Sequence, residues 1–232
     1  MQALVLVAMA VASLYALQIL LAAGGLAGLP AVVVAYVAVG VALVAYARRR
    51  GGLAVVGLAP ARVRHVIAGA LIGLATWYVG LRIVEWLHPP GDMGPVDKVL
   101  EHTSLPPSIL AIALLPAIVE ELVFRGILAR GLASRLPVAA AVAISAVLFS
   151  AFHLIPRQMV AVFPLGLALG YVAIRARSAL PTMVAHLANN AIVILATRGD
   201  LDALDRVPAN GLLALALVVV ATGLALAATG AA

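Results

Sequence analysis

Eight long apolar stretches constrain what this chain can fold into more than any other feature of its sequence. A helix that crosses a bilayer needs about 20 mostly apolar residues. Stretches of this kind recur along the 232 residues, at 2–23, 30–47, 65–87, 108–130, 137–154, 158–175, 179–198 and 210–229. Because lipid offers the backbone no hydrogen-bond partners, each stretch has to form a helix. The sequence therefore predicts an all-α fold, a polytopic membrane helix bundle with about eight transmembrane helices.

The composition agrees with a membrane protein and excludes several other classes. Hydrophobic residues make up 65% of the chain, charged residues make up 10%, and the mean hydropathy is +1.18. Soluble domains carry about 25% charged residues. The chain has no cysteine, which excludes thiolate metal sites, iron–sulfur clusters and cysteine nucleophiles. We expect a single integral membrane domain over 1–232, surrounded by the lipid bilayer and without a nucleic-acid partner.

Basic residues are distributed unevenly between the predicted loops, and cytoplasmic loops are the ones that carry an excess of arginine and lysine. The loops after odd-numbered stretches hold four: Lys98, Arg157, Arg198 and Arg206. The loops after even-numbered stretches hold nine: Arg48, Arg49, Arg50, Arg62, Arg64, Arg130, Arg135, Arg175 and Arg177. This asymmetry predicts that both termini are cytoplasmic. The composition, rich in Ala, Val, Leu and Arg, favours a prokaryotic inner (cytoplasmic) membrane.

The fourth stretch carries three charged residues at membrane depth, where an ionisable group needs a partner or a function. Glu121 and Arg125 are four residues apart and share a helix face, so Arg125 can neutralise Glu121. Glu120 points about 100° away and is left without a partner. Glu120 is therefore a candidate catalytic base. By contrast, Arg82 and Glu85, three residues apart on the third stretch, are interpreted as a local ion pair.

Two other stretches contribute histidine. The fifth ends with Phe149 and His153, and the seventh contains His186 and Asn190, which are four residues apart and share a face. A lone histidine in a bundle is usually a hydrogen-bonded core residue. Two histidines, two glutamates, an arginine and an asparagine on three apolar stretches are hard to explain by packing. The sequence predicts a buried polar site in the interior of the bundle.

Two chemistries fit these residues. In the first, Glu120 and His153 hold and deprotonate a water that attacks a carbonyl, and His186 and Asn190 donate hydrogen bonds to the oxyanion. In the second, Glu120, His153 and His186 hold a divalent metal such as zinc, which activates the water. The zinc motif H-E-x-x-H is absent, which weakens the metal alternative.

The predicted helix boundaries conflict with such a site in one respect. Glu120 lies in the middle of its stretch, His153 near one end, and His186 toward the opposite end. At about 1.5 Å per residue, their heights differ by more than a catalytic site allows. Two prolines bear on this point, because Pro116 and Pro164 lie inside apolar stretches and predict a kink or a break there. A late helix start, or short or tilted helices, would remove the conflict.

The motifs E-E-x-x-x-R, F-x-x-x-H and H-x-x-x-N occur here in that order, beginning at Glu120, Phe149 and His186. On these motifs the chain resembles the CPBP family of CAAX proteases and bacteriocin-processing enzymes, also called the Abi family. The motif-bearing core covers about 108–198.

The resemblance implies an eight-helix intramembrane endopeptidase related to the Ras-converting CAAX prenyl endopeptidase. It implies that Glu120 and His153 activate the water and that His186 and Asn190 form the oxyanion site. Glu121 and Arg125 would support the site, together with Phe149. The glutamate-type, metal-free version of this chemistry is favoured, with no cofactor.

The expected substrate is a peptide or a membrane protein, and nothing in the sequence suggests a specialisation for prenyl groups. Two other functions remain open at this point. A non-catalytic scaffold or immunity protein of the same fold would keep its function without Glu120. A proton-coupled transporter would also use buried Glu and His, but it would show inverted repeats, and no repeat is visible.

Overall fold

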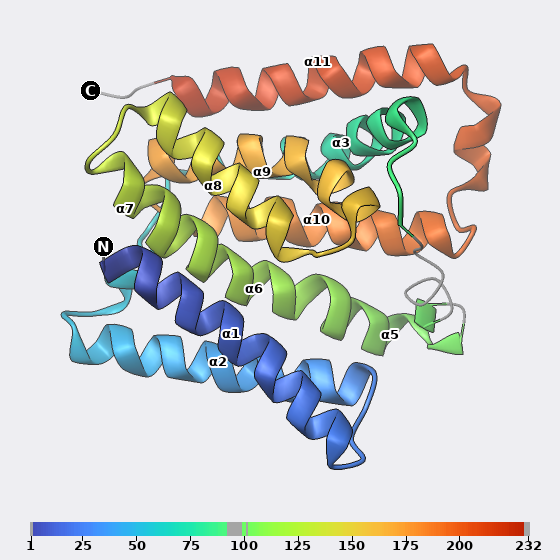
Figure 1. Ribbon diagram of the computed structural model, residues 1–232. Coiled ribbons are helices and arrows are strands. Elements are labelled where there is room, and N and C mark those ends of the chain that lie inside the picture. Colours follow the sequence, from blue (N-terminus) through green and yellow to red (C-terminus); the bar gives the residue numbers. More distant parts are fainter. Residues whose placement is uncertain (1, 92–98, 101, 230–232) are drawn as a thin grey trace.

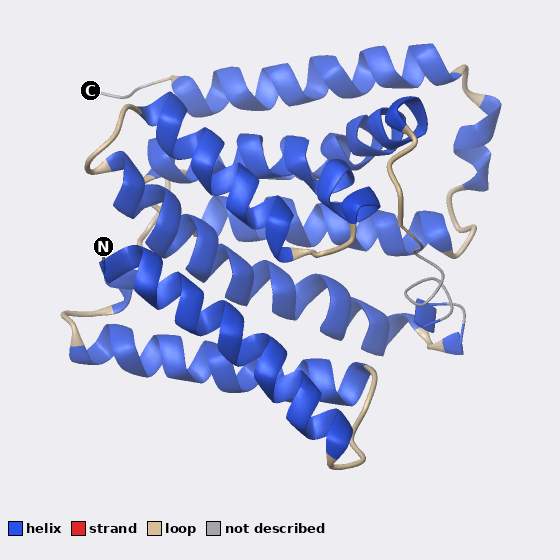
Figure 2. Cartoon of the chain, in the orientation of Figure 1, coloured by secondary structure: helices blue, strands red, loops and turns tan. Residues whose placement is uncertain are grey.

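The computed structural model describes residues 2–91, 99–100 and 102–229, and it is all-helical over those residues (Figure 2). Eight long helices follow one another, as the apolar stretches predict. They are α1 (Gln2–Ala23), α2 (Leu29–Arg49), α3 (Val63–Leu87), a composite helix (Leu105–Ala133), α8 (Val138–Phe152), α9 (Pro156–Ala176), α10 (Leu180–Thr197) and α11 (Ala209–Ala228). Two short 3₁₀ helices, η1 (Leu53–Val56) and η4 (Asp202–Arg206), lie in loops.

Seven of these helices are long and apolar enough to cross a membrane. The exception, α8, has 15 residues and measures about 22 Å, which is shorter than the roughly 30 Å of a hydrocarbon core. Large apolar side chains cover the outside of the bundle, and Ile19 and Leu20 are each 67% exposed. The protein is therefore an integral membrane protein, and these side chains face lipid.

The composite helix changes its hydrogen-bonding pattern along its length. It consists of α5 (Leu105–Ser108), the π-helical η2 (Ile109–Leu114), α6 (Leu115–Glu121), the π-helical η3 (Leu122–Ala129) and α7 (Arg130–Ala133). Proline removes a backbone donor, and wide turns are a common way to accommodate that loss. The predicted break is wrong at both prolines: the helix continues through Pro116, directly after η2, and α9 continues through Pro164.

The composite helix lies in the middle of the bundle (Figure 1). The pair α1 and α2 packs on one side of it, and α9 and α10 pack on the other, with α3 and α11 beyond them. The two helices α3 and α10 approach backbone to backbone. A Cβ at Gly69 would overlap the carbonyl oxygen of Pro181, and a Cβ at Gly73 would overlap that of Ala185. Glycine at these two positions therefore sets the close spacing of α3 and α10.

The arginine-rich loops meet at one end of the bundle, at the left of Figure 1, where α1 begins and α11 ends. Arg130 Nη1 donates to the Ala54 carbonyl at 3.1 Å, and the Ala179 amide donates to the Gly57 carbonyl at 2.9 Å. Arg175 Nη2 donates to the carbonyl of Ala228 at 2.7 Å. Lys98, which the charge count includes, lies outside the described residues. The arginine-rich end is defined by the loops 50–62, 134–137 and 177–179.

Candidate active site

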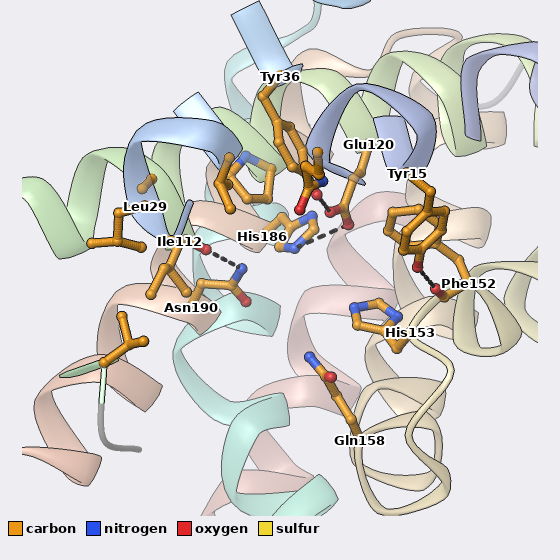
Figure 3. Close-up of a pocket in the computed structure, with 16 residues that line it drawn as sticks. Tyr15, Leu29, Tyr36, Ile112, Glu120, Phe152, His153, Gln158, His186 and Asn190 are labelled. Atoms are coloured by element: carbon orange, nitrogen blue, oxygen red, sulfur yellow. Dashed lines mark hydrogen bonds and ion pairs between the residues drawn. The ribbon is translucent and has the colours of Figure 1, made fainter. Parts of the chain in front are cut away.

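A cavity of about 400 Å³ lies inside the bundle, toward the end opposite the arginine-rich end (Figure 3). It is bounded by the last turns of α1, the first turns of α2, the composite helix, the α8–α9 connection and α10. All four predicted catalytic residues line it: Glu120, His153, His186 and Asn190. All four residues reach the same cavity, so the expected conflict in their heights does not arise. Helix α8 ends at Phe152, and the chain turns directly after His153 through Leu154, whose φ of 61° is left-handed.

Glu120 presents two carboxylate oxygens with different surroundings. Its side chain is only 4% exposed. Tyr36 Oη donates a hydrogen bond to Oε1 at 2.5 Å. Oε2 is buried and has no hydrogen-bond partner among the residues that the structure describes, and its distance to His186 Nε2 is 4.0 Å. A buried, unpaired carboxylate oxygen beside a cavity is costly in a structural role and suits an atom that receives a proton.

Glu121 and Arg125 form the buried ion pair that their spacing predicts. The distance from Arg125 Nη1 to Glu121 Oε1 is 2.8 Å, and both side chains are fully buried. The guanidinium carbon of Arg125 lies 4.0 Å from the centre of the Phe149 ring, which is a cation–π contact. Phe149 also packs edge-to-face against both imidazoles. Its ring centre lies 5.1 Å from that of His153 and 5.8 Å from that of His186. Phe149 thus packs between the ion pair and both imidazoles.

The partners of the two histidines indicate where their protons lie. His186 Nδ1 is 2.9 Å from Glu121 Oε1, and His153 Nδ1 is 3.0 Å from the carbonyl oxygen of Phe149. A carbonyl accepts, and so does a carboxylate that is paired with arginine, so we assign the proton to Nδ1 in both rings. In a neutral imidazole, Nε2 is then an acceptor. It becomes a donor only when the ring is doubly protonated.

Asn190 is held by a carbonyl group that Pro116 leaves without its usual donor. The Asn190 Nδ2 atom donates to the Ile112 carbonyl at 3.0 Å. In an α-helix that carbonyl would accept from residue 116, but proline has no N–H. The side-chain amide has two N–H groups, so the second one is free to serve a ligand in the cavity. The Ile112 carbonyl, in the π-helical segment just before Pro116, therefore anchors Asn190.

Three further polar residues, which the motifs do not indicate, complete the surroundings. Tyr36 bonds Glu120, as described above. Thr76 Oγ1 is 3.2 Å from Asn189 Oδ1, and Asn189 Nδ2 is 3.3 Å from Asn190 Oδ1. Thr76 and Asn189 thus form a chain of hydrogen bonds that runs from α3 to Asn190. Their only sequence signal is a hydroxyl or an amide inside an apolar stretch.

The metal-bound alternative would require Glu120, His153 and His186 to act together as ligands. Over the part of the chain that the structure describes, no group of three or more histidine or carboxylate side chains is placed to hold a metal ion. Glu120, His153 and His186 line one cavity, and the contact of His186 Nδ1 with Glu121 leaves Nε2 as the ring nitrogen on the side of Glu120.

A second cavity of about 300 Å³ adjoins the first on the other side of His186. The two cavities share His153, Gln158, His186 and Asn190 among their lining residues. The second cavity is mainly apolar, with walls from α3, α9 and α10 such as Trp77, Leu165 and Val193. The two histidines and Asn190 therefore lie where the two cavities meet.

The helix bundle and the carboxylate, imidazole and amide groups in its interior define a polytopic membrane protein with an enzyme-like buried site. Residues 102–192 match the protein-family model for Type II CAAX prenyl endopeptidase Rce1-like. The resemblance to the CPBP family is confirmed over that range. The match supports an intramembrane protease activity in general. No match is found among curated proteins or among solved structures.

Proposed function

We propose that this protein is a glutamate-type intramembrane endopeptidase, in which Glu120 activates the hydrolytic water. The observation that carries the proposal is the unpartnered Glu120 Oε2 atom, which is buried beside a cavity that His153, His186 and Asn190 also line. A water in this cavity donates one O–H to Glu120 Oε2 and the other to His153 Nε2. With both of its protons held in this way, the water directs a lone pair of its oxygen at a substrate carbonyl.

The hydrolysis then follows in two steps. Glu120 takes a proton from the water while the water oxygen bonds to the carbonyl carbon, which places a negative charge on the former carbonyl oxygen. The C–N bond then breaks, and the leaving nitrogen takes the proton that Glu120 received. The products are a carboxylic acid and an amine.

Asn190 and His186 stabilise the oxyanion in this proposal. The second N–H of Asn190 Nδ2 is one donor, and its hydrogen bond to Ile112 holds it in place before the reaction. His186 can donate from Nε2 only as an imidazolium, since its Nδ1 proton is already directed at Glu121. That form is electrically balanced here, because Glu120 and Glu121 carry two negative charges and Arg125 and His186 two positive ones.

The substrate in this proposal is an extended peptide or the tail of a membrane protein. The two cavities meet at the reacting groups, so each would hold the part of the substrate chain on one side of the scissile bond. The apolar walls of the second cavity favour apolar side chains next to the scissile bond. A location in a prokaryotic inner membrane with cytoplasmic termini completes the proposal.

The test compares purified wild type in detergent with Glu120→Gln on a quenched fluorescent peptide library. The matched control is Glu85→Gln, which removes a carboxylate from the exposed pair with Arg82 on α3. We expect wild type and the control to cleave, the Glu120 variant to be inactive, and a chelator to have no effect.

Three other results would change the proposal. Loss of cleavage with chelator would point to the metal alternative. Equal cleavage by the Glu120 variant would exclude Glu120 as the base. A well-folded wild type that cleaves no peptide, including peptides with apolar residues at the scissile bond, would favour the scaffold and transporter alternatives.

A further inference from the structure

A tyrosine from outside the family-matched segment touches the proposed base. Tyr36 lies on α2, 84 residues before Glu120, and its side chain is buried. Since an ionised carboxylate can only accept, the Tyr36 hydroxyl donates to Glu120 Oε1. Hydrogen bonds from a neutral donor to a charged acceptor are stronger than those between neutral groups. This contact is the only hydrogen bond to Glu120 among the side chains that the structure describes.

The packing of α2 against the composite helix fixes the position of this hydroxyl. Tyr36 belongs to a hydrophobic cluster that includes Val119 and Val123 of the composite helix. One turn further along α2, a Cβ at Gly40 would lie 3.2 Å from Val119 Cγ2, so glycine allows a close approach of the two helices beside Glu120. The tyrosine ring is therefore fixed by packing, and its hydroxyl has little freedom to leave the carboxylate.

The alternative position for the Glu120 carboxylate is against His186. In the structure, 4.0 Å separate Glu120 Oε2 and His186 Nε2, which is longer than a hydrogen bond. If His186 is protonated, Coulomb attraction in a low-dielectric interior draws the carboxylate onto it. A direct Glu120–His186 pair would occupy both the proton acceptor and the oxyanion donor. The site therefore needs a contact that keeps the Glu120 carboxylate apart from His186.

We propose that Tyr36 is a positioning residue that holds Glu120 away from His186 and keeps Oε2 available to the water. The inference rests on the proposed function, because it assigns Tyr36 a role through Glu120. It also gives the N-terminal helices, which lie outside the matched residues 102–192, a direct part in the reaction.

The test uses Tyr36→Phe, which removes only the hydroxyl and retains the packed ring. The matched control is Tyr78→Phe, whose hydroxyl donates to the Ala209 carbonyl at 3.3 Å, away from the cavity. On a peptide that wild type cleaves, we expect Tyr36→Phe to lower kcat by about 10- to 100-fold, as for loss of a hydrogen bond to a charged group. KM should stay within about twofold, because the variant keeps the ring that lines the cavity and loses only the hydroxyl directed at Glu120. The control should retain wild-type kcat.

A thermal-unfolding cycle tests the same contact without any substrate. The Tm losses of Tyr36→Phe and Glu120→Ala should be less than additive in the double variant, because each removes one partner of the same hydrogen bond. Additive losses would overturn the inference, and so would a wild-type kcat in Tyr36→Phe or a loss that appears only in KM. These results are distinct from failure of the proposed function, which an active Glu120→Gln would reveal whatever Tyr36 does.

Discussion

Replacing Gly73 with alanine tests whether the spacing of α3 and α10 controls catalysis. A Cβ at this position would lie 2.7 Å from both the carbonyl carbon and the Cα of Ala185, the residue before His186. Carbon atoms in contact are normally about 3.5–4.0 Å apart, so the two backbones have to separate locally by about 1 Å. A displacement of about 1 Å at a catalytic group can lower the rate by about 100-fold. We therefore expect Gly73→Ala to reduce kcat by about two orders of magnitude.

The assay is steady-state cleavage of a peptide in detergent, at a temperature where the circular dichroism of the variant shows intact helices. Gly170→Ala is the matched control. Its added Cβ would have its nearest contact at 3.6 Å, an ordinary van der Waals distance, in the interior of α9. We expect this control to keep its activity and to gain slightly in helix stability. A folded Gly73→Ala protein with wild-type kcat would refute the argument, because the helices would then separate without moving His186.

Three other predictions follow from the site and the arrangement of the helix ends. Asn190→Ala should lower kcat by about 100- to 1,000-fold with little change in KM, measured on the same peptide, because it removes a donor to the oxyanion. Arg125→Met should destabilise the protein by about 3–5 kcal/mol in a denaturant titration, because it leaves the buried Glu121 charge without the arginine that neutralises it and with only its contact to His186; a loss below about 1 kcal/mol would contradict the burial argument. If the arginine-rich end is cytoplasmic, a membrane-impermeant thiol reagent should label Ala27→Cys on intact cells and Ser134→Cys only after lysis. The reverse pattern would invert the topology.

Most of the fold follows from hydropathy alone. The stretch 2–23 coincides with α1, and the other boundaries differ by at most a few residues from the helices. Apolar length decides where a membrane helix runs, so this agreement has a physical cause. The two π-helical segments were outside the reach of sequence reasoning, because a wide turn depends on neighbouring helices as well as on Pro116. The early end of α8 at Phe152 was likewise invisible, since the apolar residues continue beyond it.

The candidate site was predictable to the extent that its residues are charged or occur at helical spacing. Glu120, His153, His186 and Asn190 were expected together, and all four line one cavity. Their roles remain proposals. Tyr36 escaped prediction because a single hydroxyl in an apolar helix has no spacing signal, and its partner is 84 residues away. Contacts of that kind depend on how whole helices pack, which local patterns do not encode.

The wall that α1 and α2 contribute to the cavity has a consequence for how such proteins can diversify. Gln18, Leu29 and Val32 face the cavity from these helices, and none of them belongs to the three motifs. Exchanging the first two helices between related proteins would therefore alter the shape that a substrate meets and leave the reacting groups in place. Such chimaeras would need to retain Tyr36, because α2 carries both part of the cavity wall and the hydroxyl that bonds Glu120.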